Sequence, residues 1–361
     1  MVNLYVTGYG FSGKTAICLG LASKFKEKGL EVGYFKPIGT IMTYTEGKPV
    51  DEDVVLMKKL LDLKPPVKDL CPLTLPDSFL DAMAQFSPDE LLSRIKKAYE
   101  SASGDKDIVI FESSADPERF FSFGLSTPEL AGEFEAPVLF VAKGGVDSAV
   151  DKILLCDLLC KKFGSSFLGF VLNNVPLTYL EKAKGIISPL LEKKGLRSFG
   201  IVPEDVRLTA PTVSEIIDVL GGQVLEGATL TDRLVENLMV GAMAPESALS
   251  FFRRSTDKAV ITAGDRADVA LAALETSTSV LILTDNLYPD KQVLRRAAEK
   301  GVPVILVPYD TYTTTEKLEA LTGRIKPSDA KKIELAGRAV ARHVKWRSIL
   351  KELGLLRSTS R

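Results

Sequence analysis

Short apolar runs alternate with longer segments of helical periodicity along the first 220 residues of the chain. The apolar runs predict β-strands at residues 3–7, 32–35, 107–111, 137–141, 167–172 and 198–202. The segments between these runs repeat their apolar residues every three or four positions, as in the helix predicted over residues 14–28. Strands that alternate with helices are typical of a parallel sheet covered on both faces, so the pattern predicts an α/β fold.

A second set of strands and helices follows a Gly-rich polar segment at residues 221–232. The same pattern predicts strands at residues 238–243, 258–262, 279–283 and 303–307, and helices at residues 245–254, 265–275, 290–300 and 330–353. We therefore expect a first domain at residues 1–220, a smaller α/β domain at residues 225–325 and a helical extension at residues 326–361.

The first predicted strand and helix are joined by Gly8-Tyr9-Gly10-Phe11-Ser12-Gly13-Lys14-Thr15, which matches the phosphate-binding pattern Gly-x4-Gly-Lys-Ser/Thr. Loop glycines let backbone N–H groups curl around phosphate oxygens, and the helix N-terminus adds a partial positive charge. Lys14 then supplies a charge for the β- and γ-phosphates, and the Thr15 hydroxyl is a hard oxygen ligand for Mg²⁺. The motif and its context predict a P-loop NTPase domain that binds a nucleoside triphosphate with Mg²⁺.

Further residues of this site are expected just past the ends of neighbouring strands. Glu112 follows the strand predicted at residues 107–111 and is the first candidate for a carboxylate ligand of Mg²⁺. Asp51 and Asp53 are further metal candidates, although Asp51 is placed equally well to cap the next helix. Lys36 ends the second strand, where its side chain is expected to point into the ligand crevice.

Composition narrows the classes of function. Of 361 residues, 46 are Lys or Arg and 47 are Asp or Glu, so we expect no nucleic-acid partner. His343 is the only histidine, which excludes His-based catalytic triads and His-rich metal sites. The four cysteines lack a disulfide-like spacing, and neither a signal peptide nor an apolar run of membrane-spanning length is evident. These features predict a cytoplasmic protein without a membrane partner.

Two weaker signals have a structural explanation as well as a functional one. Cys156 and Cys160 lie four residues apart and could ligate a soft metal, but their leucine and isoleucine neighbours favour a core helix. The Lys and Arg residues of the last predicted helix favour a solvated face over a nucleic-acid site.

The motifs of the first domain resemble those of dethiobiotin synthetase and of the cobyrinic acid a,c-diamide synthases. The likeness is carried by the P-loop, Phe35-Lys36-Pro37-Ile38-Gly39-Thr40, Phe111-Glu112, Gly169-Phe170-Val171-Leu172-Asn173-Asn174-Val175 and Gly200-Ile201-Val202-Pro203-Glu204-Asp205. The resemblance implies ATP as the nucleotide. It also implies that Lys14 and Lys36 are catalytic residues, which contact the phosphates and the reacting carboxyl or carbamate group.

The same resemblance implies further roles at this site. Glu112 corresponds to the acidic residue that binds Mg²⁺. The adenine site is implied to contain Asn173 or Asn174, together with Pro203 and Glu204. The sequence departs from the synthetases after Glu112, where Ser113-Ser114-Ala115-Asp116 replaces a Gly-rich part of the substrate site. The resemblance therefore does not imply which substrate is used.

The second domain resembles the DRTGG domain, named for its Asp-Arg and Thr-Gly-Gly signatures. The likeness is carried by Gly264-Asp265-Arg266-Ala267-Asp268 and its preceding strand, whereas Asp285-Asn286 stands in place of Gly-Gly. A synthetase-like domain followed by this domain resembles the N-terminal half of long bacterial phosphate acetyltransferases. The resemblance implies a modulating role and dimer contacts, so a homodimer is expected.

Polar residues of the second domain also fall just past the ends of predicted strands. They are Asp265, Arg266, Thr284, Asp285, Asp310 and Thr311. This placement predicts a crevice that senses an anion or metabolite, with Arg266 as the fork for a carboxylate or phosphate. Helix capping, for which Asp265 and Thr313 are well placed, explains the same pattern equally well.

Two functions remain open at this stage. The first is an enzyme that uses ATP to phosphorylate, and so activate, a carboxyl group of an unidentified small molecule. The second is a regulatory module that binds the nucleotide without turnover. We favour the first because the phosphate-binding and metal-binding residues Lys14, Thr15 and Glu112 are all present.

Overall fold

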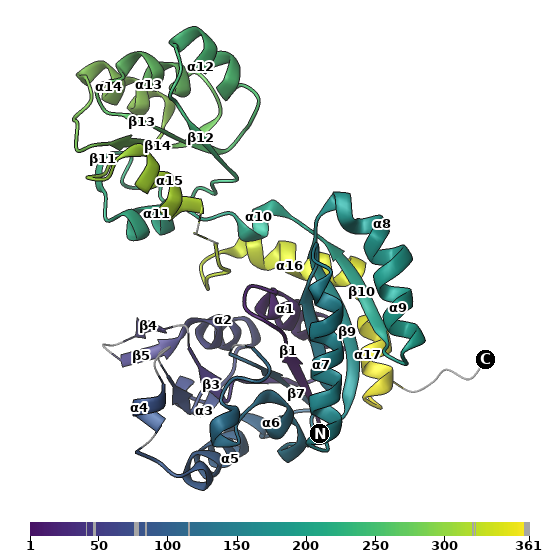
Figure 1. Ribbon diagram of the computed structural model, residues 1–361. Coiled ribbons are helices and arrows are strands. Elements are labelled where there is room, and N and C mark those ends of the chain that lie inside the picture. Colours follow the sequence, from purple (N-terminus) through teal and green to yellow (C-terminus); the bar gives the residue numbers. More distant parts are fainter. Residues whose placement is uncertain are drawn as a thin grey trace. The chain divides into compact units, whose positions relative to one another are not determined.

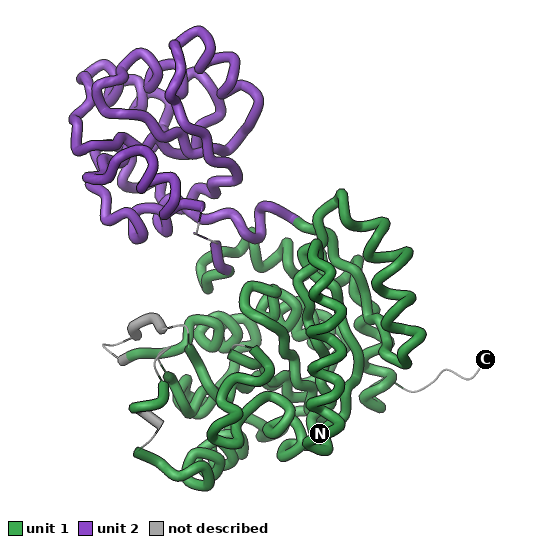
Figure 2. The backbone as a smooth tube through the Cα atoms, in the orientation of Figure 1, with its two compact units in different colours: residues 1–204, 325–361 green, residues 205–324 purple. Residues whose placement is uncertain are grey.

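The computed structural model describes residues 1–40, 42–45, 48–75, 79–83, 85–114, 116–319, 321 and 323–356. The chain forms two compact units, which Figure 2 shows in different colours. The first comprises Met1–Glu204 and Ile325–Arg361, and the second comprises Asp205–Arg324. The second unit thus begins at Asp205, before the domain boundary that the sequence places after residue 220.

The first unit is built on a six-stranded sheet in which all neighbouring strands run parallel (Figure 1). In spatial order its strands are β10 (Ser198–Pro203), β9 (Phe167–Val175), β8 (Val138–Lys143), β1 (Val2–Thr7), β7 (Ile108–Glu112) and β2 (Val32–Phe35). Most strand residues are buried, as expected for parallel strands that are covered on both faces. The predicted α/β fold with a parallel sheet is confirmed.

Helices pack on both faces of this sheet. α1 (Lys14–Glu27) and α2 (Glu52–Leu61) lie on one face, and α5 (Pro88–Ser103), α6 (Thr127–Glu133) and α7 (Ser148–Lys162) lie on the other. An aromatic cluster holds α5 in place, with the ring centroid of Tyr99 at 5.3 Å from Phe111 and 4.9 Å from Phe134. The cysteines of α7, Cys156 and Cys160, are buried, as expected for a core helix.

Shorter elements occupy the connections of the first unit. Between β2 and α5 they are β3 (Ile38–Gly39), β4 (Met42–Thr45), β5 (Lys48–Asp51), α3 (Val67–Leu70), β6 (Leu73–Thr74) and α4 (Leu80–Met83). Between β9 and β10 they are α8 (Leu180–Lys182), a π-helical turn (Ala183–Ile187) and α9 (Ser188–Lys193).

The end of the chain returns to the first unit as two helices, α16 (Ala330–His343) and α17 (Trp346–Glu352), and not as the single helix predicted over residues 330–353. The helix breaks because Val344 is extended and bridges Gly200 of β10, while the N–H of Lys345 donates to the carbonyl oxygen of Phe199 over 2.7 Å. α16 packs closely on α1, since a Cβ atom at Gly20 would lie 2.3 Å from Cγ2 of Val340.

The second unit is built on a five-stranded sheet. In spatial order its strands are β11 (Gln223–Glu226), β15 (Val304–Leu306), β14 (Thr278–Thr284), β13 (Lys258–Ala263) and β12 (Asn237–Val240). β11 is antiparallel to β15, and the other neighbours are parallel. β11 lies in the Gly-rich segment that the sequence analysis interprets as a domain boundary. Its short alternation of polar and apolar residues is too brief to predict a strand.

Two apolar clusters form the core of the second unit, one on each face of its sheet. One cluster lies under α12 (Pro245–Phe252), α13 (Ala267–Leu274) and α14 (Lys291–Lys300). The other lies under α11 (Val213–Leu220) and α15 (Thr311–Glu319). α10 (Val206–Thr209) precedes α11. Within the described residues, no helix of either unit has the length and apolar character needed to cross a membrane.

Candidate nucleotide-binding site

Two glycines of the P-loop stand where a side chain would not fit. Gly13 precedes α1 with a φ of 81°, in the left-handed region, and a Cβ atom there would lie 2.3 Å from Nδ2 of Asn173. A Cβ atom at Gly8 would lie 2.1 Å from the carbonyl oxygen of Val141. A Cβ atom at Gly10 would meet no atom within 4 Å. The loop is therefore closely packed at its two ends and open at Gly10.

The side chain of Lys14 lies over the P-loop and is 8% exposed. Its ammonium group donates hydrogen bonds to the carbonyl oxygens of Gly8 and Tyr9, over 2.9 and 3.1 Å. Burial lowers the pKa of Lys14, and the carboxylate of Glu112 offsets part of this shift. The ammonium group of Lys14, which the sequence predicts to contact the phosphates, is therefore held by the first two residues of the loop.

Glu112 connects the first turn of α1 to β2. Its carboxylate accepts a hydrogen bond from the Thr15 hydroxyl over 2.7 Å and another from the Tyr34 hydroxyl over 2.9 Å. Burial is the main cause that raises the pKa of Glu112 to about 7, and the charge of Asp53 acts in the same direction. The two residues predicted first as Mg²⁺ ligands, Thr15 and Glu112, are therefore in direct contact.

Lys36 is buried and forms ion pairs with Asp51 and Asp53, over 2.9 and 2.5 Å. Although burial acts to lower it, the pKa of Lys36 is raised well above its usual value because the charges of Asp53 and Asp51 outweigh desolvation. Asp51 also accepts hydrogen bonds from the N–H groups of Thr40 and Asp53, over 3.0 and 3.1 Å. The second of these bonds caps α2, so the capping role left open for Asp51 is observed.

The P-loop also contains a buried hydroxyl that the protein does not use. Within the described part of the chain, Oγ of Ser12 is the buried side-chain oxygen or nitrogen atom without a hydrogen-bond partner. Buried hydroxyls are normally hydrogen-bonded. A phosphate oxygen in the loop would supply a partner for Ser12, and the first N–H groups of α1 have none within the helix. These polar groups therefore fit a phosphate chain.

The carboxylates near the loop fit a nucleotide-bound Mg²⁺ better than a cage formed by protein alone. Among residues 1–40, 42–45, 48–75 and the other described ranges, no group of three or more His, Cys, Asp or Glu side chains is arranged to hold a metal ion. Mg²⁺ needs only one or two protein carboxylates when phosphate and water oxygens complete its shell, and Glu112 with Thr15 meets that need. Metal binding by Asp51 and Asp53 remains a prediction.

Asn173 and Asn174 lie near the end of β9, in different surroundings. Nδ2 of Asn173 donates a hydrogen bond to the carbonyl oxygen of Ser12 over 2.8 Å, so this side chain supports the P-loop. Asn174 has a φ of 52°, in the left-handed region that asparagine tolerates better than most residues. Pro203 pairs with Val175 at the next strand. Adenine recognition by Asn173, Asn174, Pro203 or Glu204 remains a prediction.

The segment after β7 makes contacts that the sequence did not predict. Oδ1 of Asp116 accepts a hydrogen bond from the N–H of Gly10 over 2.9 Å. The hydroxyl of Thr7 lies 2.9 Å from that of Ser113 and 3.3 Å from that of Thr127. A cavity of about 10 Å³, enough for one water molecule, lies beside them. The sequence hinted at a special role for this segment only because Ser113-Ser114-Ala115-Asp116 departs from the synthetase pattern. Ala115 lies outside the described residues.

In the second unit, the arginine predicted as an anion-binding fork is held by local partners. Nε of Arg266 donates to Asp268 over 3.1 Å, and its Nη2 donates to the carbonyl oxygen of Met243 over 2.9 Å. Arg266 occupies the N-cap position of α13, so Asp265 lies outside the helix. Capping of α13 by Asp265 is not observed, and ligand binding by these two residues remains a prediction.

The other predicted crevice residues lie at the ends of β14 and β15. The hydroxyl of Thr284 donates to the carboxylate of Asp285 over 2.7 Å. Oδ1 of Asp310 accepts a hydrogen bond from the N–H of Thr313 over 2.7 Å. Asp310 therefore caps α15, and the capping role that the sequence analysis gave to Thr313 is wrong. The reason is that α15 begins at Thr311, so Thr313 supplies the N–H group that the cap satisfies.

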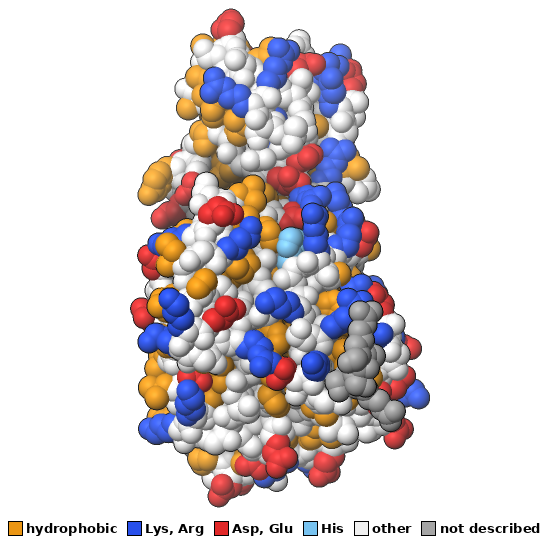
Figure 3. Space-filling view, turned by 90° about the vertical axis from the view of Figure 1, so that its right-hand side faces the viewer, with side chains coloured by type: hydrophobic (Ala, Val, Ile, Leu, Met, Phe, Trp, Pro, Cys, Tyr) orange, Lys and Arg blue, Asp and Glu red, His pale blue; other side chains and the backbone are white. Residues whose placement is uncertain are grey.

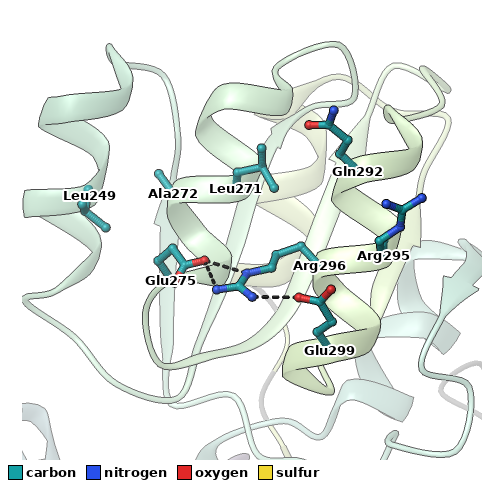
Figure 4. A pocket seen from close by; sticks show the side chains of 8 residues that line it. All are labelled: Leu249, Leu271, Ala272, Glu275, Gln292, Arg295, Arg296 and Glu299. Carbon is teal, nitrogen blue, oxygen red and sulfur yellow. Dashed lines mark hydrogen bonds and ion pairs between the residues drawn. The ribbon is translucent and has the colours of Figure 1, made fainter.

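A groove of about 420 Å³ lies between α12, α13 and α14 of the second unit (Figure 4). It is lined by Leu249, Leu271, Ala272, Glu275, Gln292, Arg295, Arg296 and Glu299. Arg296 forms ion pairs in it with Glu275 and Glu299, over 2.5 and 2.8 Å. The sequence analysis did not single out this groove because charged residues on helices are typical of a solvated surface.

Charged side chains of both signs are mixed on the face that Figure 3 shows, with Lys and Arg side chains gathered beside the histidine. On α16 and α17, the basic residues Lys331, Arg338, Arg342 and Arg347 are exposed. Their exposure agrees with the predicted solvated face, whereas Lys332 of α16 is buried and departs from it.

Comparison with known proteins finds a matching family model for each of the two parts of the chain. A family model described as "AAA domain" matches residues 2–212, and one described as "DRTGG domain" matches residues 215–321.

Curated relatives include the phosphate acetyltransferase of Pseudomonas putida. It is 28% identical over 350 residues, and the match covers 92% of this chain and 49% of the relative. The phosphate acetyltransferase of Nitratidesulfovibrio vulgaris is 28% identical over 362 residues, covering 95% of this chain and 50% of the relative. The chain spans about half the length of the curated relatives it matches.

Solved structures show more distant similarity. The CBS and DRTGG domains of the regulatory region of Clostridium perfringens pyrophosphatase, complexed with the activator diadenosine tetraphosphate, match with 20% identity and a TM-score of 0.29. The match covers 43% of this chain and 80% of that chain. The septum site-determining protein MinD of Pyrococcus horikoshii, complexed with Mg-ADP, matches with 15% identity and a TM-score of 0.36, covering 57% of this chain and 84% of that chain.

The family assignment follows from the extent of the first match. The "AAA domain" model covers more than half of the 361 residues, and it includes the P-loop, Lys36, Glu112 and Asn173. The DRTGG match begins within the second unit. This order of domains, and the coverage of the curated relatives, agree with the N-terminal half of long phosphate acetyltransferases. The chain therefore belongs to the AAA domain family of P-loop proteins and carries a DRTGG domain after its P-loop domain.

Proposed function

We propose that this chain binds ATP with Mg²⁺ at the P-loop and uses it to phosphorylate a carboxyl-type substrate. The observation that carries the ATP-binding step is the buried, unpartnered Oγ of Ser12 within a loop that otherwise satisfies its polar side chains. Lys14 lies over the same loop and supplies the positive charge that a phosphate chain requires. Asn174, Pro203 and Glu204 are the proposed lining of the adenine site.

The proposed metal site uses the contact between Thr15 and Glu112. A bound Mg²⁺ would neutralise charge on the phosphates. Glu112 must lose its proton to act as a ligand, and because its pKa is raised to about 7, metal binding near neutral pH is coupled to release of that proton. Asp53 is proposed as a second metal residue, and Asp51 as a supporting one. Lys36 would then turn from these two carboxylates towards the reacting group.

The proposed chemistry is in-line phosphoryl transfer. A carboxylate oxygen of the substrate attacks the γ-phosphorus, the bond to the β–γ bridging oxygen breaks, and ADP leaves with that electron pair. The product is an acyl phosphate, ready to react with a nucleophile. Lys14 and Lys36 would hold the charge that spreads over the phosphoryl oxygens.

A second candidate function is a regulatory module that binds ATP without turnover. The observation in its favour is that the curated relatives are named phosphate acetyltransferase, while this chain spans about half of their length. In this version the residues Asp265, Arg266, Thr284, Asp285 and Asp310 form a ligand-sensing site. The second unit could also provide the contacts of a homodimer.

Calorimetric titration of the full chain with ATP and Mg²⁺ tests the binding step. We expect Lys14→Ala to weaken ATP binding at least 100-fold, because it removes the charge within the loop. Lys24→Ala is the matched control, since Lys24 lies on the same helix and pairs with the exposed Glu27. Equal affinities of the wild type and Lys14→Ala would rule out the P-loop as the ATP site.

Release of ADP separates the two candidate functions. If the chain is an enzyme, ADP should accumulate over hours when carboxylic acids are added, and Lys36→Ala should stop this while ATP still binds. Tight ATP binding with no ADP release under any tested substrate supports the regulatory module. Substrate-stimulated ADP release that Lys36→Ala leaves unchanged would contradict the proposed catalytic role of Lys36.

A further inference from the structure

Asp116 lies in the turn that follows β7, and its side chain reaches the P-loop. Oδ1 of Asp116 accepts a hydrogen bond from the N–H of Gly10 over 2.9 Å. A hydrogen bond between a carboxylate and a backbone N–H is stronger than one between neutral groups. Asp116 therefore places a negative charge directly against a loop whose N–H groups are suited to phosphate oxygens.

The turn that carries Asp116 is held by contacts that do not involve Gly10. The N–H of Arg119 donates to the carbonyl oxygen of Asp116 over 3.0 Å. The guanidinium carbon of Arg119 lies 5.3 Å from the centroid of the Phe120 ring, within the range of a cation–π contact. A change confined to the carboxylate of Asp116 should therefore leave this turn folded.

The contact falls on the half of the loop that faces the terminal phosphate. In a P-loop, backbone N–H groups of the loop cradle the phosphates, and the lysine reaches the β- and γ-phosphates, so the part of the loop beside the lysine is the part nearest the γ-phosphate. Nζ of Lys14 lies at the carbonyl oxygens of Gly8 and Tyr9, which assigns the segment from Gly8 to Gly10 to the γ-phosphate side. The space beside Gly10 is open, since a Cβ atom there would meet no atom within 4 Å.

A second carboxylate lies on the same side of the loop. Burial raises the pKa of the Tyr9 hydroxyl, and the charge of Glu118 and its hydrogen bond with Tyr9 raise it further. Glu118 is exposed, so its charge is better screened than one held against the backbone. Of these two carboxylates, that of Asp116 is the one bonded to the N–H of Gly10.

We propose that Asp116 determines nucleotide specificity by competing with the γ-phosphate for the N–H of Gly10. A nucleoside diphosphate ends before this position and leaves the Asp116–Gly10 hydrogen bond intact. A nucleoside triphosphate must displace the carboxylate, and the turn of residues 116–119 moves with it. The loop thereby distinguishes a triphosphate from a diphosphate by charge and by a change of contact. This inference rests on the proposed binding of ATP at the P-loop.

Titration of ADP and ATP, each with Mg²⁺, into three forms of the full chain tests the proposal. Asp116→Asn keeps an oxygen that can accept the hydrogen bond from Gly10 but removes the charge, and Asp116→Ala removes both. We expect the ratio of ATP affinity to ADP affinity to rise about tenfold in Asp116→Asn and further in Asp116→Ala, with ADP affinity nearly unchanged.

Glu118→Gln is the matched control because it removes a charge from the same turn without touching Gly10. We expect it to change the affinity ratio less than Asp116→Asn does. Equal changes of ATP and ADP affinity in the Asp116 variants, or an equal effect of Glu118→Gln, would overturn the proposal. Failure of the wild type to bind either nucleotide in a manner that depends on Lys14 would instead reject ATP binding itself, and this inference with it.

Discussion

The P-loop site and the strand-end residues of the second unit look alike in sequence but differ in structure. Both sets of polar residues follow strands of a mainly parallel sheet. In the first unit, Lys36 and Glu112 are each 1% exposed, and each is bonded to buried or partly buried side chains. In the second unit, the Arg266 side chain is 37% exposed and pairs with Asp268, two residues later. Position at a strand end therefore does not by itself distinguish a ligand site from a set of helix caps.

The difference is one of energy as well as geometry. Buried charges are costly unless neighbouring charges and hydrogen bonds compensate them, so a buried cluster constrains every member. Exposed pairs are screened by water and contribute little. The first unit maintains a cluster of this costly kind around its P-loop, whereas Arg266 and Asp268 of the second unit pair at an exposed position. This contrast favours the P-loop as the main binding site of the chain.

The largest expected effect is on the free energy of unfolding. It is measured by replacing one buried cation, Lys36, and one more exposed cation, Arg296. Lys36→Met removes the shared partner of Asp51 and Asp53, and we expect the free energy of unfolding of the first unit to fall by about 3–5 kcal/mol. Arg296→Met breaks two exposed ion pairs in the second unit and should cost about 1 kcal/mol or less. Hydrogen exchange in increasing urea measures each unit separately. Similar losses in the two variants would remove the energetic contrast between the units.

The next largest effect is on the pH dependence of stability, which is expected to have opposite signs for Glu112 in the first unit and Asp310 in the second. The pKa of Glu112 is raised from 4.5 to about 7, so its folded form holds a proton that the unfolded form has lost. The stability that this proton provides is complete below pH 4.5 and is lost as the pH rises through about 7, a change of about 3 kcal/mol at most. Glu112→Gln should abolish this loss, as measured by urea unfolding between pH 4 and 8.

Asp310 provides the opposite sign in the second unit. Hydrogen bonds from Thr313 lower the pKa of Asp310 below its usual value of 3.8, so its contribution to stability is present above that pH and is lost on acidification.

Mg²⁺-dependent ATP binding should follow the ionisation of Glu112 and strengthen about tenfold per pH unit towards pH 7. A pH profile of binding that Glu112→Gln leaves unchanged would contradict the role proposed for this carboxylate.

The smallest expected effect compares two glycines in the left-handed region, Gly13 before α1 and Gly301 after α14. A Cβ atom at Gly301 would lie 3.7 Å from its nearest neighbour, so Gly301→Ala should cost only the backbone strain of about 1 kcal/mol. Gly13→Ala adds a clash with Asn173 and should cost more, together with a loss of ATP binding. Urea midpoints and ATP titration of both variants measure these effects. Equal costs would show that Asn173 can move away from the loop.

The features predicted best from the sequence are those whose residues lie close together along the chain. The P-loop was recognisable because its strand, glycines, lysine and helix are contiguous. Except for the antiparallel edge strand β11, strand positions in both sheets were predicted to within a few residues, because buried parallel strands form continuous apolar runs. The positions of Lys36 and Glu112 at strand ends made them candidates, the family resemblance implied the same roles, and the structure places both of them near the loop.

Contacts between distant segments could not be predicted in the same way. Asn173 and Asp116 touch the P-loop across 161 and 106 residues, and only the order of the strands in the sheet brings them there. The break between α16 and α17 likewise depends on pairing of Val344 with Gly200. In the second unit, Asp310 rather than Thr313 caps α15, because the helix begins three residues earlier than a cap at Thr313 would require.

The return of the chain to β10 has a topological consequence. Because the first unit comprises Met1–Glu204 and Ile325–Arg361, the second unit is an insertion, joined to its host by two covalent connections. A fragment truncated after the insertion would retain the P-loop but expose the side of α1 where Gly20 receives Val340. A P-loop unit suitable for separate expression therefore has to splice residue 204 to residue 325 and cannot simply stop at the end of the matched AAA domain.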